Sequence, residues 1–121
     1  MPGHRNKGLF YEQQALHWLQ QQGLELVAQN YHSRFGEIDL IMLQSDTLCF
    51  IEVKYRQSAN FGGAAYSIPP SKQKKISQTA LSFIASHPRY QQHAYRFDAL
   101  LIQSQQTEWI KGAFEATGSA F

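Results

Sequence analysis

Two long apolar segments, separated by a few polar residues, limit most strongly how this chain can fold. They cover residues 35–43 and 48–56, and Ser45 and Asp46 lie between them. β-Branched and aromatic residues are enriched in strands, and a short polar interruption favours a tight turn. The two segments therefore predict an antiparallel hairpin at the centre of the fold.

The rest of the chain predicts helices and strands around this hairpin. Residues 8–22 carry apolar side chains at three- and four-residue spacing and are followed by Gly23, which predicts a helix that ends there. The other expected elements, in chain order, are a strand over residues 24–31, a helix from Pro69 and Pro70 to just before Pro88, a strand over residues 95–102 and a short strand over residues 108–111.

The order of these elements predicts one α/β domain. A strand, a long helix and a further strand form a β-α-β crossover, whose strands should be parallel and whose connection should be right-handed. With the hairpin, this gives a mixed central β-sheet flanked by helices, in the order α-β-β-β-α-β. We expect a single domain over residues 1–121, with a flexible N-terminus (1–7), a mobile loop (57–68) and a flexible tail (115–121).

Composition argues against several classes of protein. The sequence has no apolar run of about 18 residues, so no membrane partner is expected. Cys49 is the single cysteine, so no disulfide framework is expected, and the cytoplasm is the simplest compartment. The net charge of +2 does not by itself indicate a nucleic-acid partner.

Charged residues inside the two apolar segments are the most informative local feature. If the turn has two residues, Asp39 lies opposite Glu52 and Glu37 lies opposite Lys54, all on one face of the hairpin. Facing carboxylates repel each other, and a divalent cation would relieve that repulsion. The alternative is a solvated face on which Glu37 and Lys54 form an ion pair.

Two carboxylates beside a lysine suit phosphodiester hydrolysis. Asp39 and Glu52 could hold Mg²⁺ or Mn²⁺, which polarises a phosphoryl oxygen and helps to generate hydroxide. Lys54 could stabilise the developing charge or position the water. This combination predicts a metal site with Asp39, Glu52 and Lys54 as catalytic residues.

The same residues carry a resemblance to a known superfamily. "GEIDLI" followed by "FIEVKYR" resembles the PD-(D/E)XK, restriction-endonuclease-like motif, with Asp39 as the aspartate and Glu52-Val53-Lys54 as the triplet. More narrowly, residues 7–114 resemble the YraN family of small bacterial proteins, through Gly8, Glu12, Asn30, "RFGEIDLI", "FIEVKYR", "PPSKQKK" and "YRFDALLI". This resemblance implies a nuclease-like fold similar to archaeal Holliday junction resolvases. The proline of the superfamily motif is absent before Asp39.

The resemblance also bears on the acids outside the core motif. Glu12 lies on the apolar stripe of the first helix, and the resemblance implies that a glutamate there approaches the metal. The alternative is an edge residue that reaches water or pairs with a cation. Glu37 precedes the motif aspartate by two residues and is a further candidate metal ligand.

Basic residues crowd the start of the second helix. Lys72, Lys74 and Lys75 lie where the helix dipole is already positive, which suggests a phosphate partner. Gln73, Arg56 and Arg34 could extend this surface, although a solvated basic turn is the alternative. These residues predict binding to nucleic acid, most simply DNA.

These observations predict a divalent-metal-dependent nuclease that hydrolyses DNA, with branched or structured DNA suggested by the resemblance. A nucleic-acid-binding module that keeps the fold without cutting, and a scaffold protein that binds no metal, are the alternatives. A homodimer is compatible with the sequence.

Overall fold

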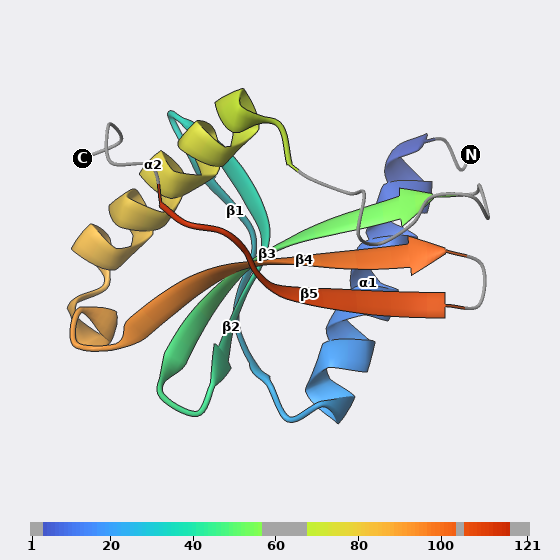
Figure 1. The fold of residues 1–121 in the computed structure, drawn as a ribbon, viewed down its shortest axis with the longest axis horizontal. Coiled ribbons are helices and arrows are strands. Elements are labelled where there is room, and N and C mark those ends of the chain that lie inside the picture. The colour runs from blue at the N-terminus through green and yellow to red at the C-terminus, as the bar shows by residue number, and fades with distance from the viewer. Residues whose placement is uncertain (1–3, 57–67, 104–105, 117–121) are drawn as a thin grey trace.

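The structure of the chain, a computed structural model, describes residues 4–56, 68–103 and 106–116. Figure 1 shows helices packed around a strongly twisted sheet. The elements in chain order are α1 (His4–Gln21), β1 (Glu25–Ser33), β2 (Gly36–Gln44), β3 (Thr47–Arg56), α2 (Pro70–Ser86), the short 3₁₀ helix η2 (Pro88–Tyr90), β4 (Ala94–Gln103) and β5 (Gln106–Phe114). The predicted element order and the mixed α/β class are confirmed, with a full fifth strand at the end.

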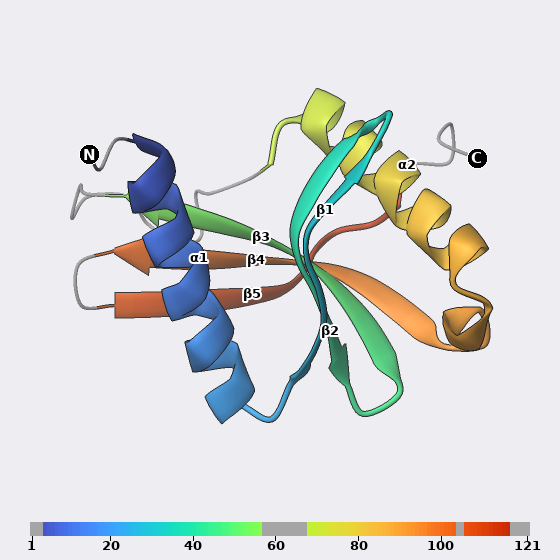
Figure 2. The same cartoon turned by 180° about the vertical axis from the view of Figure 1, so that it is seen from behind.

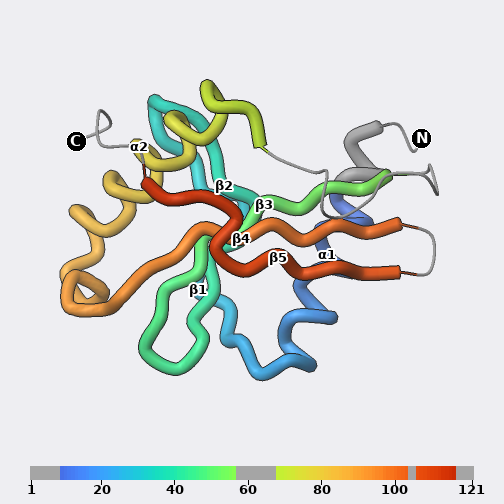
Figure 3. The backbone as a smooth tube through the Cα atoms, viewed as in Figure 1, coloured from blue at the N-terminus to red at the C-terminus, as the bar shows by residue number. Residues whose placement is uncertain are grey.

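The sheet has the strand order β1-β2-β3-β4-β5. β3 and β4 are parallel and are connected through α2, whereas every other neighbouring pair is antiparallel. Gln44 pairs with Thr47, so the central hairpin turns through Ser45 and Asp46 as the sequence predicts. The backbone trace follows this turn from β2 into β3 (Figure 3).

Each face of the sheet is covered by one helix. The opposite views of Figures 1 and 2 place α1 across one face and α2 across the other. The core under α1 includes Ala15, Leu19, Leu40, Ile51 and Leu100. The core under α2 includes Ile38, Phe50, Ile76, Phe83 and Phe97. Because burying one large apolar side chain contributes about 1.5–3 kcal/mol, these two cores hold the helices onto the sheet.

Some boundaries differ from the sequence predictions. α1 begins at His4, so its backbone includes part of the segment expected to be a flexible N-terminus. Within the predicted loop over residues 57–68, only Ile68 is described, and it is buried. Of the predicted tail over residues 115–121, residues 117–121 lie outside the described part. β5 is longer than the predicted 108–111 strand because edge pairing with β4 extends from Gln106 to Phe114.

The two halves of the sheet separate at the motif residues. β2 and β3 pair only as far as Leu40 and Ile51. Beyond that point β2 stays paired with β1, and β3 stays paired with β4 as far as Arg56. Figure 1 shows β2 and β3 diverging there. We call this opening, between residues 36–39 of β2 and 52–56 of β3, the strand fork.

Candidate acidic site in the strand fork

Asp39 lies at the base of the fork and bridges its two strands. The backbone N–H of Val53 donates a hydrogen bond to Oδ2 of Asp39, with 2.8 Å between nitrogen and oxygen. A side-chain oxygen therefore takes the position that a backbone carbonyl would occupy if the β2–β3 ladder continued. Because Val53 is the middle residue of the Glu52-Val53-Lys54 triplet, this bond fixes the aspartate against the triplet.

Glu52 is the most deeply buried acid of the fork. Its side chain is 8% exposed, and its Oε1 lies 3.2 Å from Nζ of Lys72. Its second oxygen, Oε2, is buried and has no hydrogen-bond partner in the described part of the structure. A buried carboxylate oxygen without a partner is costly in free energy, which makes this atom a natural ligand for a cation.

Glu12 reaches the same opening from α1. Its Oε1 is likewise buried and unpartnered among the described residues. Asn30, a β1 residue with a positive φ of 48°, lies near the Glu12 carboxylate and lowers its pKa, in opposition to burial. The fork thus forms a pocket of about 260 Å³ lined by Tyr11, Glu12, Asp39, Glu52, Val53, Lys54, Tyr55 and Lys72.

The environment raises the pKa of all three pocket acids. Burial is the main cause for Glu12, Asp39 and Glu52, and the negative charge of Asp39 adds to it at the other two. The pKa of Glu52 rises from 4.5 to about 7. The ammonium of Lys72 opposes this effect at both Asp39 and Glu52. The pocket therefore holds less positive charge than its carboxylates require.

These residues fit a magnesium-type ion. Hard cations prefer carboxylate oxygens, and Mg²⁺ commonly takes only one or two of them while it keeps several waters. Asp39 and Glu52 can provide two carboxylates, and no donor among the described residues bonds to Oε2 of Glu52 or Oε1 of Glu12. Within residues 4–56, 68–103 and 106–116, no three acid, histidine or cysteine side chains converge closely enough to hold a metal by themselves. A bound ion would therefore depend on water or a substrate oxygen.

The other predicted site residues are distributed differently. Lys54 lines the pocket and is exposed. Glu37 is 47% exposed, lies 3.3 Å from the His32 ring and does not line the pocket. Its charge nevertheless contributes to the raised pKa of the three pocket acids.

The predicted nucleic-acid residues do not share one location. Gln73 donates to the Ile68 carbonyl oxygen over 2.6 Å, so its amide holds the start of α2. Lys75 is exposed on α2, and Arg56 is half-buried at the end of β3. Arg34 lies in the β1–β2 turn over the Phe35 ring. Of this group, only Lys72 enters the acidic pocket.

Two features of the pocket were not expected from the sequence. Lys72 contacts Glu52 directly, although the lysines of α2 suggested only a phosphate-binding surface. Tyr11 of α1 and Tyr55 of β3 stack with ring centroids 3.8 Å apart, and both line the pocket. The sequence could have indicated these tyrosines only by position, because Tyr11 precedes Glu12 and Tyr55 lies three residues after Glu52.

Asp98 shows how a purely structural acid differs from those of the fork. It is buried in β4 and accepts four hydrogen bonds: two from Arg96, one from the Trp109 indole and one from the Gly112 backbone. Its carboxylate is fully satisfied by the protein, which indicates a structural role.

Fold and site together define a small α/β domain with an acidic pocket where its central sheet divides. Within the described residues, no helix is long and apolar enough to span a membrane. The chain belongs to the uncharacterised protein family UPF0102, whose model matches residues 11–102. This is the YraN family that the sequence resembles.

Curated relatives match the chain over most of its length. A UPF0102 protein of Psychromonas ingrahamii is 50% identical over 112 residues, which cover 91% of this chain and 90% of the relative. One of Nitrosomonas eutropha is 47% identical over 95% of this chain and 98% of its own length. A UPF0102 protein of Pseudomonas putida is 44% identical over 86% of this chain and 89% of its own length.

Proposed function

We propose that this protein is a divalent-metal-dependent nuclease that hydrolyses phosphodiester bonds in DNA, with branched or otherwise structured DNA as its substrate class. The observation that supports this most is that Asp39 and the buried Glu52 line one pocket at the strand fork together with Lys54 and Lys72. The resemblance to the PD-(D/E)XK superfamily supplies the choice of DNA and of branched substrates.

Each residue has a distinct role in this proposal. Asp39 and Glu52 would hold Mg²⁺ or Mn²⁺, and Glu12 would assist them. When bound, such an ion polarises a phosphoryl oxygen and lowers the pKa of a coordinated water. Lys54, at the exposed rim, stabilises the negative charge that develops on the phosphate.

Substrate binding is assigned to the basic side of α2. Lys72 lies at the pocket, and Lys74 and Lys75 are exposed on the next residues of the helix. The first turn of α2 contains no acidic residue, so the helix dipole and the lysines attract the same anion. We assign phosphate contacts to these lysines, with Arg56 and Arg34 as outer contributors.

A cleavage screen tests the catalytic assignment. Linear, branched, flapped and single-stranded DNA are incubated with the protein and Mn²⁺ or Mg²⁺, and products are resolved on denaturing gels. We expect cleavage by the wild type and a loss of at least 100-fold in Asp39→Asn, Glu52→Gln and Lys54→Ala, on the scale of lost electrostatic stabilisation. Glu108→Gln, which neutralises an exposed acid on β5, is the matched control and should retain activity. Full activity in both Asp39→Asn and Lys54→Ala would refute the assignment.

One observation favours a second candidate, a nucleic-acid-binding module that does not cut. Lys72 already supplies a positive charge to Glu52, so the pocket has partial compensation without a metal. This alternative expects DNA binding in EDTA and no cleavage of any substrate. Replacing Lys72, Lys74 and Lys75 by glutamine should then weaken binding and reduce its salt dependence, as measured by fluorescence anisotropy from 50 to about 200 mM salt. Unchanged binding in that triple variant would count against it.

A further inference from the structure

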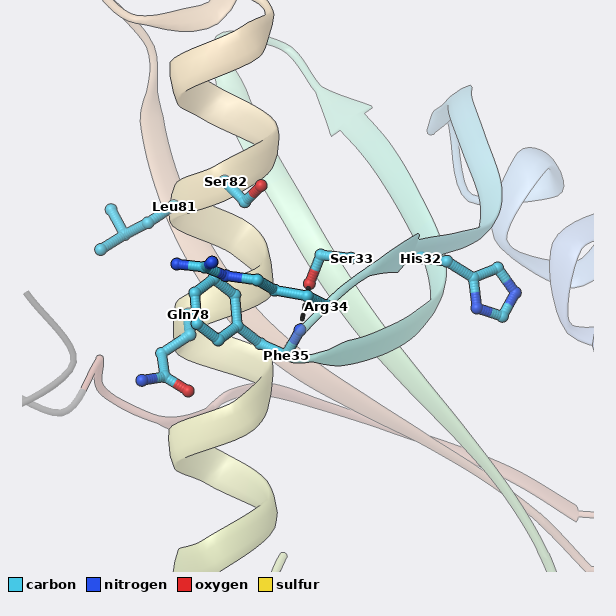
Figure 4. Close-up of a pocket in the computed structure, with 7 residues that line it drawn as sticks. All are labelled: His32, Ser33, Arg34, Phe35, Gln78, Leu81 and Ser82. Atoms are coloured by element: carbon cyan, nitrogen blue, oxygen red, sulfur yellow. Dashed lines mark hydrogen bonds between the residues drawn. The ribbon is translucent and has the colours of Figure 1, made fainter.

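A second and larger hollow lies away from the acidic pocket, between the β1–β2 turn and the middle of α2. Its volume is about 640 Å³. Figure 4 shows Arg34 and Phe35 from the turn facing Gln78, Leu81 and Ser82 from the helix, while the His32 ring points away from them. The residues that line it are His32, Ser33, Arg34, Phe35, Gln78, Leu81 and Ser82.

The chemistry of this hollow suits a nucleobase. The Arg34 guanidinium carbon lies 4.9 Å from the centre of the Phe35 ring, so a planar cation covers an aromatic face. Gln78 offers an amide donor and acceptor, and Leu81 offers an apolar wall. None of the described residues that line the hollow carries a carboxylate. Unstacked bases are typically bound by aromatic rings and guanidinium planes, with polar side chains on their edges.

The turn that presents Arg34 and Phe35 is held firmly against the helix. The Phe35 backbone N–H donates to the Ser33 hydroxyl oxygen over 3.0 Å, and the Ser33 and Thr79 hydroxyls are hydrogen-bonded at 3.0 Å. A Cβ at Gly36, whose φ is +152°, would lie 3.6 Å from the Lys75 Cβ, so strand and helix approach closely here. A rigid support of this kind lowers the entropy cost of binding.

The hollow and the acidic pocket are aligned along one helix. Lys72 lines the pocket, whereas Gln78 and Ser82 line the hollow. Six to ten helical residues at about 1.5 Å each separate them by roughly 9–15 Å along the axis. Lys75, beside Gly36, lies between the two sites.

We propose that this hollow is a nucleobase-binding subsite that takes one unstacked base from a single-stranded DNA segment whose phosphate lies at the acidic pocket, roughly 9–15 Å away along α2. Arg34 and Phe35 form the stacking surface, and Gln78 contacts the base edge. This proposal rests on the proposed function, which supplies the path of the DNA strand past the acidic pocket. Base binding at the subsite requires no metal and no cleavage. The subsite and the nuclease activity can therefore be refuted independently of each other.

The test measures binding of fluorescein-labelled single-stranded dT₁₂ by anisotropy in EDTA. Arg34→Lys keeps the charge but removes the guanidinium plane, and Phe35→Leu keeps apolar volume but removes the ring. We expect each to weaken binding about tenfold, in the range known for loss of one base stack. The salt dependence of Arg34→Lys should match that of the wild type because no charge is lost.

Arg89→Lys is the matched control, because Arg89 also lies over an aromatic ring, that of Tyr90, 5.2 Å from its centre, in η2. It should bind like the wild type. Folding of each variant is checked by its thermal midpoint. Three results would overturn the subsite. The first is wild-type affinity in folded Arg34→Lys and Phe35→Leu, and the second is equally weakened binding in Arg89→Lys. The third is a wild type that binds duplex DNA but not single strands. A wild type that binds dT₁₂ through Arg34 but cuts no DNA would leave the subsite intact and refute the nuclease.

Discussion

At the scale of single residues, Glu52 and Asp98 show two outcomes for a carboxylate buried in the same sheet. Asp98 accepts hydrogen bonds from Arg96, Trp109 and Gly112, so its charge is balanced and its oxygens are satisfied. Glu52 has Lys72 at one oxygen and nothing described at the other. The arrangement at Asp98 stabilises the fold. The burial of Glu52 with one unpartnered oxygen instead costs free energy, and a bound ligand can remove that cost.

This cost predicts that Glu52→Gln stabilises the protein at alkaline pH. The pKa of Glu52 is about 7 in the folded chain against an ordinary value of 4.5, so between these values the folded state holds more protons than the unfolded state. Stability therefore falls as the pH rises from 4.5 through 7, by at most about 3 kcal/mol. In urea denaturation without divalent ions, Glu52→Gln should exceed the wild type by about 1–3 kcal/mol at pH 8. The two should be nearly equal at pH 5.

Asp98→Asn is the matched comparison for that measurement. The new amide group would face donors instead of accepting from them. The free energy of unfolding of Asp98→Asn should therefore be about 2–4 kcal/mol lower than that of the wild type at both pH values. A Glu52→Gln effect that is the same at pH 5 and pH 8 would contradict the raised pKa of Glu52. Stabilisation of the chain by Asp98→Asn would contradict the structural role of Asp98.

At the scale of elements, the sequence was sufficient for the hairpin and insufficient for the fork. Two apolar segments and a two-residue polar turn determine the pairing from Gln44–Thr47 to Leu40–Ile51. Where that pairing ends depends on Asp39 accepting the Val53 N–H and on the twist of the whole sheet. Neither is encoded in local periodicity, since both arise only when the sheet is assembled.

The position of α2 illustrates the same limit. The three- and four-residue spacing of Ile76, Ala80 and Phe83 is typical of a buried helix face, and all three are buried, whereas Ile84 on the same stripe is half-buried. The contact between Lys72 and Glu52 was not predictable, because it depends on how the chain returns to the fork after β3. Local reasoning about the helix dipole singled out Lys72 but could not identify Glu52 as its contact.

This contact predicts that Lys72→Gln raises the pKa of Glu52 further. Lys72 lowers that pKa both by its charge and by its hydrogen bond, so removing the ammonium leaves burial and Asp39 unopposed. An NMR titration of the Glu52 side-chain carbonyl carbon should show a higher midpoint in the variant than in the wild type. Lys75→Gln, which neutralises an exposed lysine one turn later, should leave the midpoint unchanged. An unaltered midpoint in Lys72→Gln would show that the ion pair does not persist in solution.

At the scale of the whole molecule, charge and architecture are arranged around the division of the sheet. Glu12 comes from α1, Asp39 and Glu52 from the two separating strands, and Lys72 from α2. Both covering helices and both halves of the sheet therefore contribute lining residues to this pocket. An ion bound there would link these four elements, and its binding free energy would add to the stability of the whole domain.

Mg²⁺ should consequently raise the thermal midpoint of the protein in a pH-dependent manner. At a concentration one hundred times the dissociation constant, a single site stabilises the folded state by about 2.7 kcal/mol, which is several degrees or more for a domain of this size. Below pH 7 the ion must displace a proton from Glu52, so the apparent affinity should fall about tenfold per pH unit. Differential scanning fluorimetry at pH 8 and pH 6, at matched ionic strength, measures both effects. Asp39→Asn and Glu52→Gln should abolish the shift, whereas Glu108→Gln should retain it. A shift that survives both pocket substitutions would place the ion elsewhere on the molecule.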